Sequence, residues 1–456
     1  MSYDVIVVGA GPAGAVAAKT TAEKGLSTLL IERGEYPGQK SVGGEFLPVS
    51  IFEEFPWMRG GPLQRRINGW VFFLPSGDEA TEIRYSRKME YGYTVHRPEW
   101  DRWVGGFAES AGAELKTSTL VEGVIRDESG CARGVVTDKG ERLYSKIVIG
   151  ADGVNSVTAR SLGLRKNLSL NSVALCAKYT YTLPPEKIEE RFGGFYGSEI
   201  EILFGEEICP RGFAWIFPSE RDFCIGIGCG LDAMEKNIFS YLQEVVTLPR
   251  VKDKVQDAKL MNYSTHLVPI YGAPEQTYGG GFLLVGDAAG FVCPFDGAGY
   301  EAAAMSGKMA GEVAAEAISL GDVSAKTLRG YEDKWMKSFI GKDITYGRKV
   351  QDYVVNKMGV DLFNRMIYEM GSAMTKHGSY TGKSHGEAVE EFLSRYAKTL
   401  AEMTVQLAPS GTVPLKEVAK LLLGIGRTTI LSKKRDKTTP RKGDTPPADG
   451  VTHPKL

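Results

Sequence analysis

The chain has 456 residues, 43% of them hydrophobic, which suits two or three globular domains with substantial cores. Lysine and arginine number 55 and aspartate and glutamate 56, so the formal net charge of −1 gives no global field that would attract nucleic acid. The six cysteines form no C-x-x-C pair and no metal-ligand spacing, so we expect neither a metal site nor an iron–sulfur cluster.

The first 32 residues predict a nucleotide-binding βαβ unit. An apolar run at residues 5–8 leads directly into the glycine-rich segment 9–14 (GAGPAG), a helix is expected over 15–24, and a second apolar run ends in Glu32. The glycines let backbone N–H groups approach a pyrophosphate, and the N-terminus of the helix stabilises its charge. An acid after the second strand can bind a ribose and disfavours a 2′-phosphate, so FAD or NAD is expected rather than NADP.

A Gly/Pro-rich connection over residues 34–48 follows and is too long for a tight turn, which indicates a functional loop. Its paired glycines, Gly43 and Gly44, suit close approach of the backbone to a ligand. Alternating aromatic residues over 68–95 predict antiparallel strands, and apolar spacing over 98–111 predicts a helix.

Short strands are expected at residues 120–125, 134–137 and 147–149, which resume the nucleotide-binding fold after an insertion. Residues 170–270 predict a second, mostly β domain that covers the cofactor and contains a hairpin formed by 214–218 and 224–228. After Lys326 the pattern is helical to about residue 423, and the composition from Lys433 onward is typical of a disordered tail.

A second dinucleotide signal lies at the strand 281–285, its turn 286–290 (GDAAG) and a long helix over 299–320. We expect Asp287 to bind ribityl or ribose hydroxyls. Gly297 and Gly299 would begin a helix beneath an isoalloxazine ring, where side chains would clash with the ring. The positive end of that helix favours an anionic reduced flavin.

These features together predict an α/β fold: a Rossmann-like FAD-binding domain with an inserted antiparallel β-sheet substrate domain and a helical C-terminal region. The expected parts are residues 1–67, 96–165 and 276–325 for the FAD-binding domain, 68–95 and 166–275 for the substrate domain, 326–432 for the helical region and 433–456 for the tail.

Segments 9–14, 96–101 (HRPEWD), 151–153 (ADG) and 286–289 (GDAA), with Glu32, resemble two-domain FAD enzymes built like para-hydroxybenzoate hydroxylase. Within them the chain is similar to the branch that joins electron-transfer-flavoprotein:quinone oxidoreductases of the FixC type with archaeal geranylgeranyl reductases. The resemblance covers about residues 1–350. Its motifs are specific for FAD and much less so for substrate.

The resemblance implies that Ala13 and Asp287 lie at the pyrophosphate, Arg97 near the phosphates, Val121 at the adenine and Tyr300 at the flavin ring. The expected cofactor-binding residues are Gly9, Gly11, Ala13, Gly14, Glu32, Arg33, Gly43, Gly44, Arg97, Val121, Asp152, Gly286, Asp287, Gly297, Gly299 and Tyr300.

The substrate site is predicted from aromatic strand positions. Phe213, Trp215 and Phe217, with Phe72, suit the wall of an apolar tunnel, although such alternation is also typical of an ordinary core. A lone histidine, His266, and Cys293 are more typical of structural roles, so no catalytic residue is assigned. The reductases usually show Cys-Gly-Glu at the flavin loop, whereas residues 43–45 here read Gly-Gly-Glu, so no role of that cysteine transfers.

The first functional hypothesis is a FixC-like FAD-dependent oxidoreductase that transfers electrons or hydride between FAD and a lipid-soluble quinone or isoprenoid. Its partners would be an electron-transfer flavoprotein and a separate ferredoxin-like protein. The alternatives are a geranylgeranyl (isoprenoid double-bond) reductase, a non-catalytic flavin electron-relay subunit of a complex and, with weaker support, an aromatic monooxygenase.

The sequence starts with a strand and contains no long uncharged apolar span, so we expect a cytoplasmic protein. Residues 415–435 combine apolar and basic side chains. This pattern is typical of a peripheral contact with the inner face of a membrane, and equally of a helix packed on its own domain with a solvated basic end.

Overall fold

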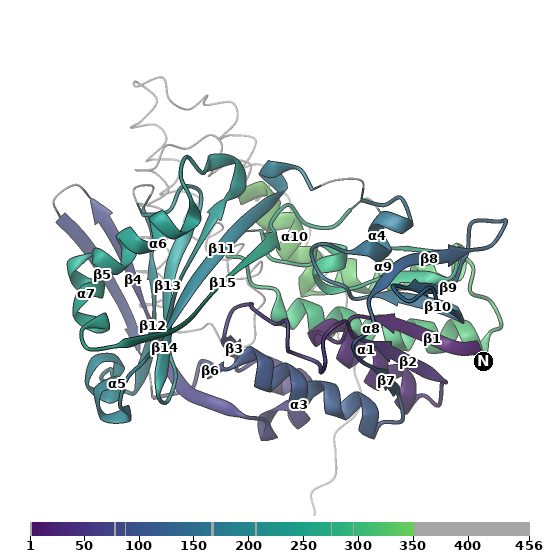
Figure 1. Ribbon diagram of the computed structural model, residues 1–456, viewed down its shortest axis with the longest axis horizontal. Coiled ribbons are helices and arrows are strands. Elements are labelled where there is room, and N and C mark those ends of the chain that lie inside the picture. Colours follow the sequence, from purple (N-terminus) through teal and green to yellow (C-terminus); the bar gives the residue numbers. More distant parts are fainter. Residues whose placement is uncertain are drawn as a thin grey trace, which may run out of the picture. The chain divides into compact units, whose positions relative to one another are not determined.

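Strands of two β-sheets alternate along the described part of the chain (Figure 1). The computed structural model describes residues 2–350 except 77, 78, 87, 166, 167, 206, 207, 275 and 295. Most of the expected helical region, the expected tail and the basic segment 415–435 therefore lie outside the described residues.

The first sheet contains the predicted βαβ unit, β1 (Ser2–Val8), α1 (Pro12–Glu23) and β2 (Thr28–Ile31). Its strand order is β16-β17-β10-β1-β2-β7, with β8 and β9 forming an antiparallel extension beside β10. The four central strands are parallel, and Val5, Ile6 and Val7 are completely buried in a core cluster that includes residues of α1, α8 and β9. The other strands are β7 (Glu114–Lys116), β8 (Val121–Arg126), β9 (Ala132–Thr137), β10 (Arg142–Gly150), β16 (Tyr278–Gly279) and β17 (Phe282–Leu284).

Close packing of α1 against α8 (Tyr300–Ser319) aligns the two helices that begin at the nucleotide site. Glycines permit this approach: an added Cβ at Gly307 would lie 2.2 Å from the carbonyl oxygen of Ala13. At Gly311 it would lie 2.7 Å from Cβ of Thr20. Larger residues would therefore separate the helices and displace their N-termini.

The second sheet has the order β15-β11-β14-β13-β12-β4-β6-β3, with β5 beside β4. The expected hairpin is confirmed as the antiparallel pair β13–β14, and the named pairs are antiparallel except the parallel pair β12–β4. The strands are β3 (Phe46–Pro48), β4 (Leu63–Ser76), β5 (Glu79–Ser86), β6 (Gly92–Val95), β11 (Val173–Thr182), β12 (Ser198–Leu203), β13 (Phe213–Pro218), β14 (Asp222–Gly230) and β15 (Lys259–Pro269).

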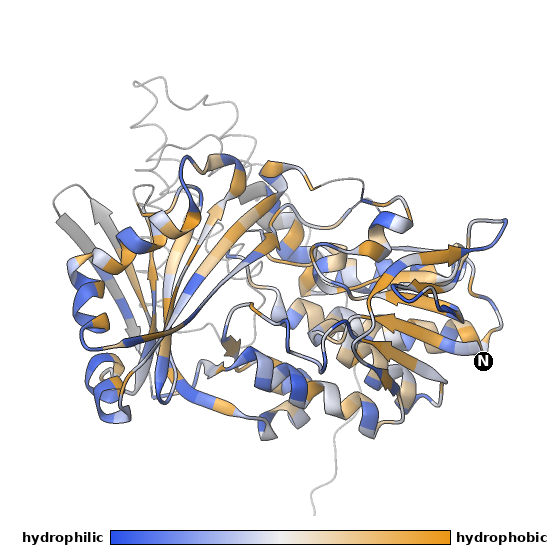
Figure 2. Cartoon of the chain, in the orientation of Figure 1, coloured by the Kyte–Doolittle hydropathy of each residue, from blue (hydrophilic) through white to orange (hydrophobic). Residues whose placement is uncertain are grey.

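The described helices that pack on this second sheet lie on one of its faces. Ile225 and Ile227 of β14 are buried in one cluster with Leu242 of α6. The hydropathy colouring shows apolar strands beneath helices with hydrophilic outer faces (Figure 2). The opposite face of the sheet turns toward the nucleotide-binding sheet. The covering helices are α5 (Pro185–Phe192), α6 (Ile238–Thr247) and α7 (Pro249–Val255).

The chain enters the second sheet earlier than the expected boundary at residue 68. β3 already pairs with β6, and β4 begins at Leu63, both within the range 1–67 that we assigned to FAD binding. A three-residue strand after a glycine-rich loop is too short to show alternation, so its place could not be predicted.

Two further helices, α9 (Ala325–Lys337) and α10 (Phe339–Val350), begin the expected helical region. The first docks on the nucleotide-binding sheet, where the Tyr331 hydroxyl donates to the Leu284 carbonyl at 2.7 Å and the Trp335 indole N–H donates to the Thr277 hydroxyl at 3.0 Å. Among the described residues, no helix is long and apolar enough to cross a membrane.

Candidate active site

A cavity of about 1190 Å³ is lined by residues of both sheets. Single small-molecule sites usually measure roughly 300 to 1,000 Å³. This volume is therefore large enough to hold a cofactor together with part of a second ligand. The expected cofactor residues that line it are Gly9, Gly11, Ala13, Glu32, Arg33, Gly43, Gly44, Arg97, Val121, Asp152, Gly286, Asp287, Gly297, Gly299 and Tyr300.

Gly11 occupies the N-cap of α1, with Pro12 as the first helical residue. A Cβ added at Gly11 would meet no protein atom within 4 Å, so the glycine faces open cavity at the positive end of the helix. Gly9 has a φ of 97°, which permits the tight turn that leads into α1. This arrangement is a cradle for an anion such as a pyrophosphate.

Gly14 does not line the cavity, although we placed it with the cofactor residues. An added Cβ there would lie 1.8 Å from the carbonyl oxygen of Gly9. The third glycine of the motif thus lets the helix pack against the preceding turn.

The Glu32 carboxylate is anchored at the end of β2. It accepts the backbone N–H of Ala10 at 3.0 Å and that of Gly34 at 2.7 Å, and the residue is 8% exposed. A carboxylate has about four lone-pair sites, so both oxygens keep capacity to accept ribose hydroxyls.

The Asp152 carboxylate accepts hydrogen bonds from neighbouring protein groups. It accepts the Ser156 hydroxyl at 2.5 Å, and the N–H and hydroxyl of Thr158 at 2.9 and 3.0 Å. These bonds organise the start of α4 (Val157–Ser161). The neighbouring Gly153 lines the cavity and faces open space, since an added Cβ would meet no protein atom within 4 Å.

Arg97 is the first residue of α3 (Arg97–Ser110) and is fixed by a two-pronged ion pair with Asp101, at 3.1 and 2.9 Å. Asp101 also accepts the Ser41 hydroxyl at 2.5 Å, which ties the 34–48 loop to α3. Burial lowers the pKa of the Arg97 guanidinium, but the charge and hydrogen bonds of Asp101 raise it. The net effect is a pKa above the ordinary value. An added Cβ at Gly43 would lie 2.6 Å from Nη1 of Arg97, so a larger residue there would have to displace the guanidinium.

A second nearly buried ion pair supports the same loop from the other sheet. Nζ of Lys178 on β11 lies 2.7 Å from Oε1 of Glu45, with side-chain exposures of 13% and 11%. The two residues lie far apart in the sequence and sit in no shared motif, so sequence reasoning missed this pair.

Tyr300 begins α8 and lines the cavity. Its hydroxyl accepts the Trp100 indole N–H at 2.6 Å, and the Arg97 guanidinium lies 5.0 Å from the centroid of its ring. Burial raises the pKa of Tyr300 above its ordinary value, so the phenol stays protonated. Gly299 is the N-cap of this 20-residue helix.

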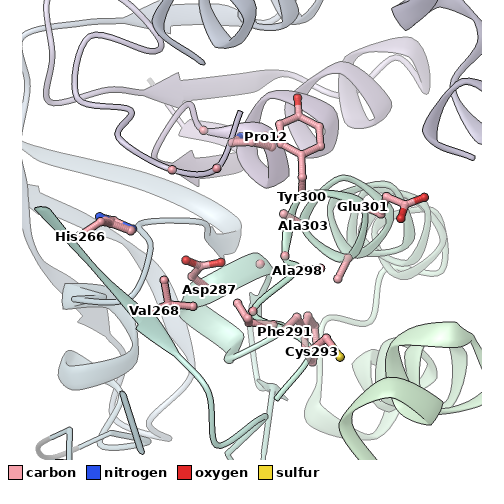
Figure 3. Close-up of a pocket in the computed structure, with 18 of the residues that line it drawn as sticks. Pro12, His266, Val268, Asp287, Phe291, Cys293, Ala298, Tyr300, Glu301 and Ala303 are labelled. Atoms are coloured by element: carbon pink, nitrogen blue, oxygen red, sulfur yellow. The ribbon is translucent and has the colours of Figure 1, made fainter. Parts of the chain in front are cut away.

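Asp287 and His266 lie on the same side of the pocket (Figure 3). Burial raises the pKa of Asp287, an effect opposed by the charges of His266, Arg97 and Arg165. Burial lowers the pKa of His266, an effect that Asp287 opposes. We expected His266 to be structural, but it lines the cavity with its alternate neighbours on β15, Ser264 and Val268. Cys293 also lines the cavity.

A connected set of aromatic rings lines part of the second sheet's side of the cavity. Seven rings form a closed series in which the centroids of neighbouring rings lie 5.3 to 6.3 Å apart, and the last ring, Phe217, lies next to the first, Phe46. We call this set the aromatic wall. Its members, all of which line the cavity, are Phe46, Trp70, Phe72, Phe204, Phe213, Trp215 and Phe217.

Trp215 lies flat over the neighbouring strand. An added Cβ at Gly226 of β14 would lie 2.2 Å from the indole, so this glycine makes room for the ring. The indole nitrogen is buried without a hydrogen-bond partner. Phe213, Trp215 and Phe217 thus lie together as predicted, whereas Phe46, Trp70 and Phe204 were not singled out.

Comparison with known proteins identifies the family. A family model described as an FAD binding domain matches residues 2–177. Digeranylgeranylglycerophospholipid reductase of Methanocaldococcus jannaschii is 33% identical over 379 residues, covering 82% of this chain and 91% of the relative. The chain belongs to this family of FAD-dependent oxidoreductases.

FixC of Azorhizobium caulinodans is a further relative of this FAD-dependent oxidoreductase, 31% identical over 358 residues, which is 75% of this chain and 82% of FixC. The fold matches a geranylgeranyl bacteriochlorophyll reductase-like protein from Thermoplasma acidophilum with a TM-score of 0.74 and 24% identity, covering 87% of this chain and 99% of that one. The expected fold class, the FAD cofactor and the enzyme class are thereby confirmed.

The residues of this oxidoreductase fit FAD. Added Cβ atoms at Gly11, Gly44, Gly153 and Gly297 would each meet nothing within 4 Å, which marks a backbone cradle around open space. The anion site at α1 suits the pyrophosphate, Glu32 suits a ribose, and the N-terminus of α8 suits a negatively charged ring.

Proposed function

We propose that the enzyme reduces carbon–carbon double bonds in the isoprenoid chain of a lipid. This differs from our first hypothesis, a FixC-like quinone oxidoreductase. Two lines of support favour it: the name of the 33%-identical relative, a digeranylgeranylglycerophospholipid reductase, and the aromatic wall. The aromatic wall is the observation that carries the proposal, because a continuous apolar surface suits a long hydrocarbon chain.

Reduced FAD, when bound, supplies the hydride for such a reaction. The protein's own contribution is orientation and exclusion of water. The aromatic wall would hold the hydrocarbon chain, while the loop fixed by Arg97–Asp101 and Lys178–Glu45 would hold the opposite edge of the site. The positive end of α8 would stabilise negative charge beside Tyr300.

A lipid-soluble quinone is the second candidate acceptor. It is favoured by the 31% identity to FixC and by Gly43 at the position where the reductases usually show cysteine. A quinone also has a flat ring that stacks well on aromatic side chains. An electron-transfer flavoprotein and a ferredoxin-like protein would then be the partners.

The test is an anaerobic reoxidation experiment. Full-length, FAD-loaded protein is reduced with dithionite, freed of excess reductant and mixed separately with a geranylgeranyl lipid, its fully saturated phytanyl analogue and a quinone. We expect the unsaturated lipid to restore the oxidised flavin spectrum and to gain two hydrogens per reduced bond. The saturated analogue is the matched control and should do nothing. Reoxidation by the quinone alone would contradict the proposal.

A further inference from the structure

Two cysteines meet at one end of the second sheet. Cys209 precedes β13 and Cys229 lies on β14, 20 residues later, yet their sulfur atoms are 2.9 Å apart. The surrounding backbone holds them together, since the Gly230 N–H lies 3.3 Å from the carbonyl oxygens of both Pro210 and Arg211. Both residues are buried, but Cys209 also lines the cavity.

We propose that Cys209 and Cys229 are a redox-active thiol pair that hydrogen peroxide converts into a disulfide. In the first step the Cys209 sulfur attacks peroxide, the O–O bond breaks, a sulfenic acid forms and water leaves. In the second, the Cys229 sulfur attacks that of Cys209, the S–S bond forms and a second water leaves. Two thiols and one peroxide thus give one disulfide and two waters.

The order of the steps follows from access. Cys209 borders the cavity and Cys229 does not, so a small uncharged oxidant that enters the cavity meets Cys209 first. Cys209 is only 1% exposed, so access of the oxidant limits this first step. The second step needs no diffusion, because the resolving sulfur is already adjacent.

The other nearby cysteines are poorly placed to compete. Cys176 also lines the cavity, but burial, with a smaller effect from Cys229, raises its pKa to about 12 and keeps it a protonated thiol. Cys224 lies on β14 near Glu45, and burial raises its pKa well above the ordinary value. The 2.9 Å contact between the Cys209 and Cys229 sulfur atoms is what selects this pair.

A disulfide between Cys209 and Cys229 would restrain the part of the aromatic wall that begins at Phe213. The segment that follows Cys209 leads directly into β13 and Phe213, and a disulfide would tie it covalently to β14. The loop that the bond closes is about 20 residues long, which is long enough to stabilise the folded state appreciably.

The experiment uses full-length, FAD-loaded protein treated with excess hydrogen peroxide, then alkylated and digested without reductant. We expect a peptide that joins Cys209 to Cys229, lighter than the two thiol peptides together by two hydrogen atoms and split by dithiothreitol. Cys229→Ser should lose this peptide and accumulate oxygenated Cys209. Cys224→Ser, a buried cysteine on the same strand, is the matched control and should keep it.

Thermal stability gives a second readout that needs no peptide analysis. The oxidised wild-type protein should melt several degrees above the reduced protein, and this difference should vanish in Cys229→Ser. Absence of the linked peptide after peroxide, a disulfide between any other two cysteines, or irreversible oxygenation of Cys209 in the wild-type protein would overturn the proposal.

Discussion

The two sides of the cavity present different kinds of surface to a ligand. On the nucleotide-binding sheet, main-chain groups at helix N-termini and at glycines that face open space line the cavity. The conformation of each such turn is set by residues a few positions away in the sequence. On the second sheet, rings from β3, β4, the end of β12 and β13 form one apolar surface. Backbone recognition leaves a short sequence signature, whereas a surface assembled from distant side chains leaves only a partial one, such as the alternating aromatic residues of β13.

The largest effect should come from Gly14→Val. The new side chain would overlap the Gly9 carbonyl, where an added Cβ lies only 1.8 Å away. We expect the free energy of unfolding to fall by more than about 3 kcal/mol, the upper end of ordinary overpacking, because backbone cannot move aside easily. Urea denaturation monitored by circular dichroism measures this. A stably folded variant would show that α1 can shift.

Gly11→Val is the matched comparison on the same motif. Its side chain meets no protein atom, so the fold should survive while the valine fills the pyrophosphate cradle. We expect FAD binding to be lost, measured as the absence of a flavin spectrum after reconstitution with FAD. Retained FAD in a folded variant would place the phosphates elsewhere.

On the second sheet the sharpest probe is Trp215→Glu. A carboxylate in the aromatic wall would have to be desolvated by an apolar substrate, at a cost of several kcal/mol. We expect flavin reoxidation by the geranylgeranyl lipid to slow about 100-fold, equivalent to about 2.7 kcal/mol, with FAD content unchanged. Stopped-flow absorbance gives the rate.

Phe195→Glu is the control for this variant, since Phe195 is 84% exposed and does not line the cavity. Its reoxidation rate should match that of the wild-type protein. Equal rates in both variants would mean that the acceptor binds elsewhere, and loss of FAD from the Trp215 variant would assign the indole to folding.

Glu32→Ala should have a smaller effect. It leaves the N–H groups of Ala10 and Gly34 without their carboxylate partner and removes the expected ribose contact. FAD affinity should fall by about 1 to 3 kcal/mol, measured by titrating the apoprotein with FAD. Glu23→Ala, which removes a surface ion pair with Lys19 on α1, should leave affinity unchanged.

The smallest effect concerns His96, which joins α3 to the second sheet through Asp222 at 3.0 Å. The hydrogen bond to Asp222 raises the pKa of His96 above its ordinary value, despite partial burial. The stabilisation is therefore complete below the ordinary pKa of about 6.5 and is lost as pH rises through the raised pKa.

His96→Gln should remove this dependence. The stability difference between wild type and variant should shrink as pH increases above about 6.5, measured by urea denaturation at a series of pH values. Parallel pH curves for the two proteins would contradict the assignment.

Local patterns explain what could be predicted from the sequence. The βαβ unit, the β13–β14 hairpin and the helices α3 and α8 were expected within a few residues of their observed bounds. Phe46 and Phe204 were missed because one lies on a three-residue strand and the other just past the end of β12. The sequence did not pair Cys209 with Cys229, because their contact depends on how the segment before β13 packs on β14.

The alternation of the two sheets along the chain affects how the protein is made. β1 pairs with β10 through residues 144–150, and β10 pairs with residues 282–284 of β17. At roughly 5 to 20 residues per second, a ribosome needs about a quarter of a minute to a minute to reach that last strand. Until then the sheet around the apolar strand β1 is incomplete and its hydrophobic surface is exposed. We therefore expect the nascent chain to depend on chaperones. The nucleotide site also needs Asp287 and Tyr300, which emerge later still, so we expect FAD to load late in translation or after release.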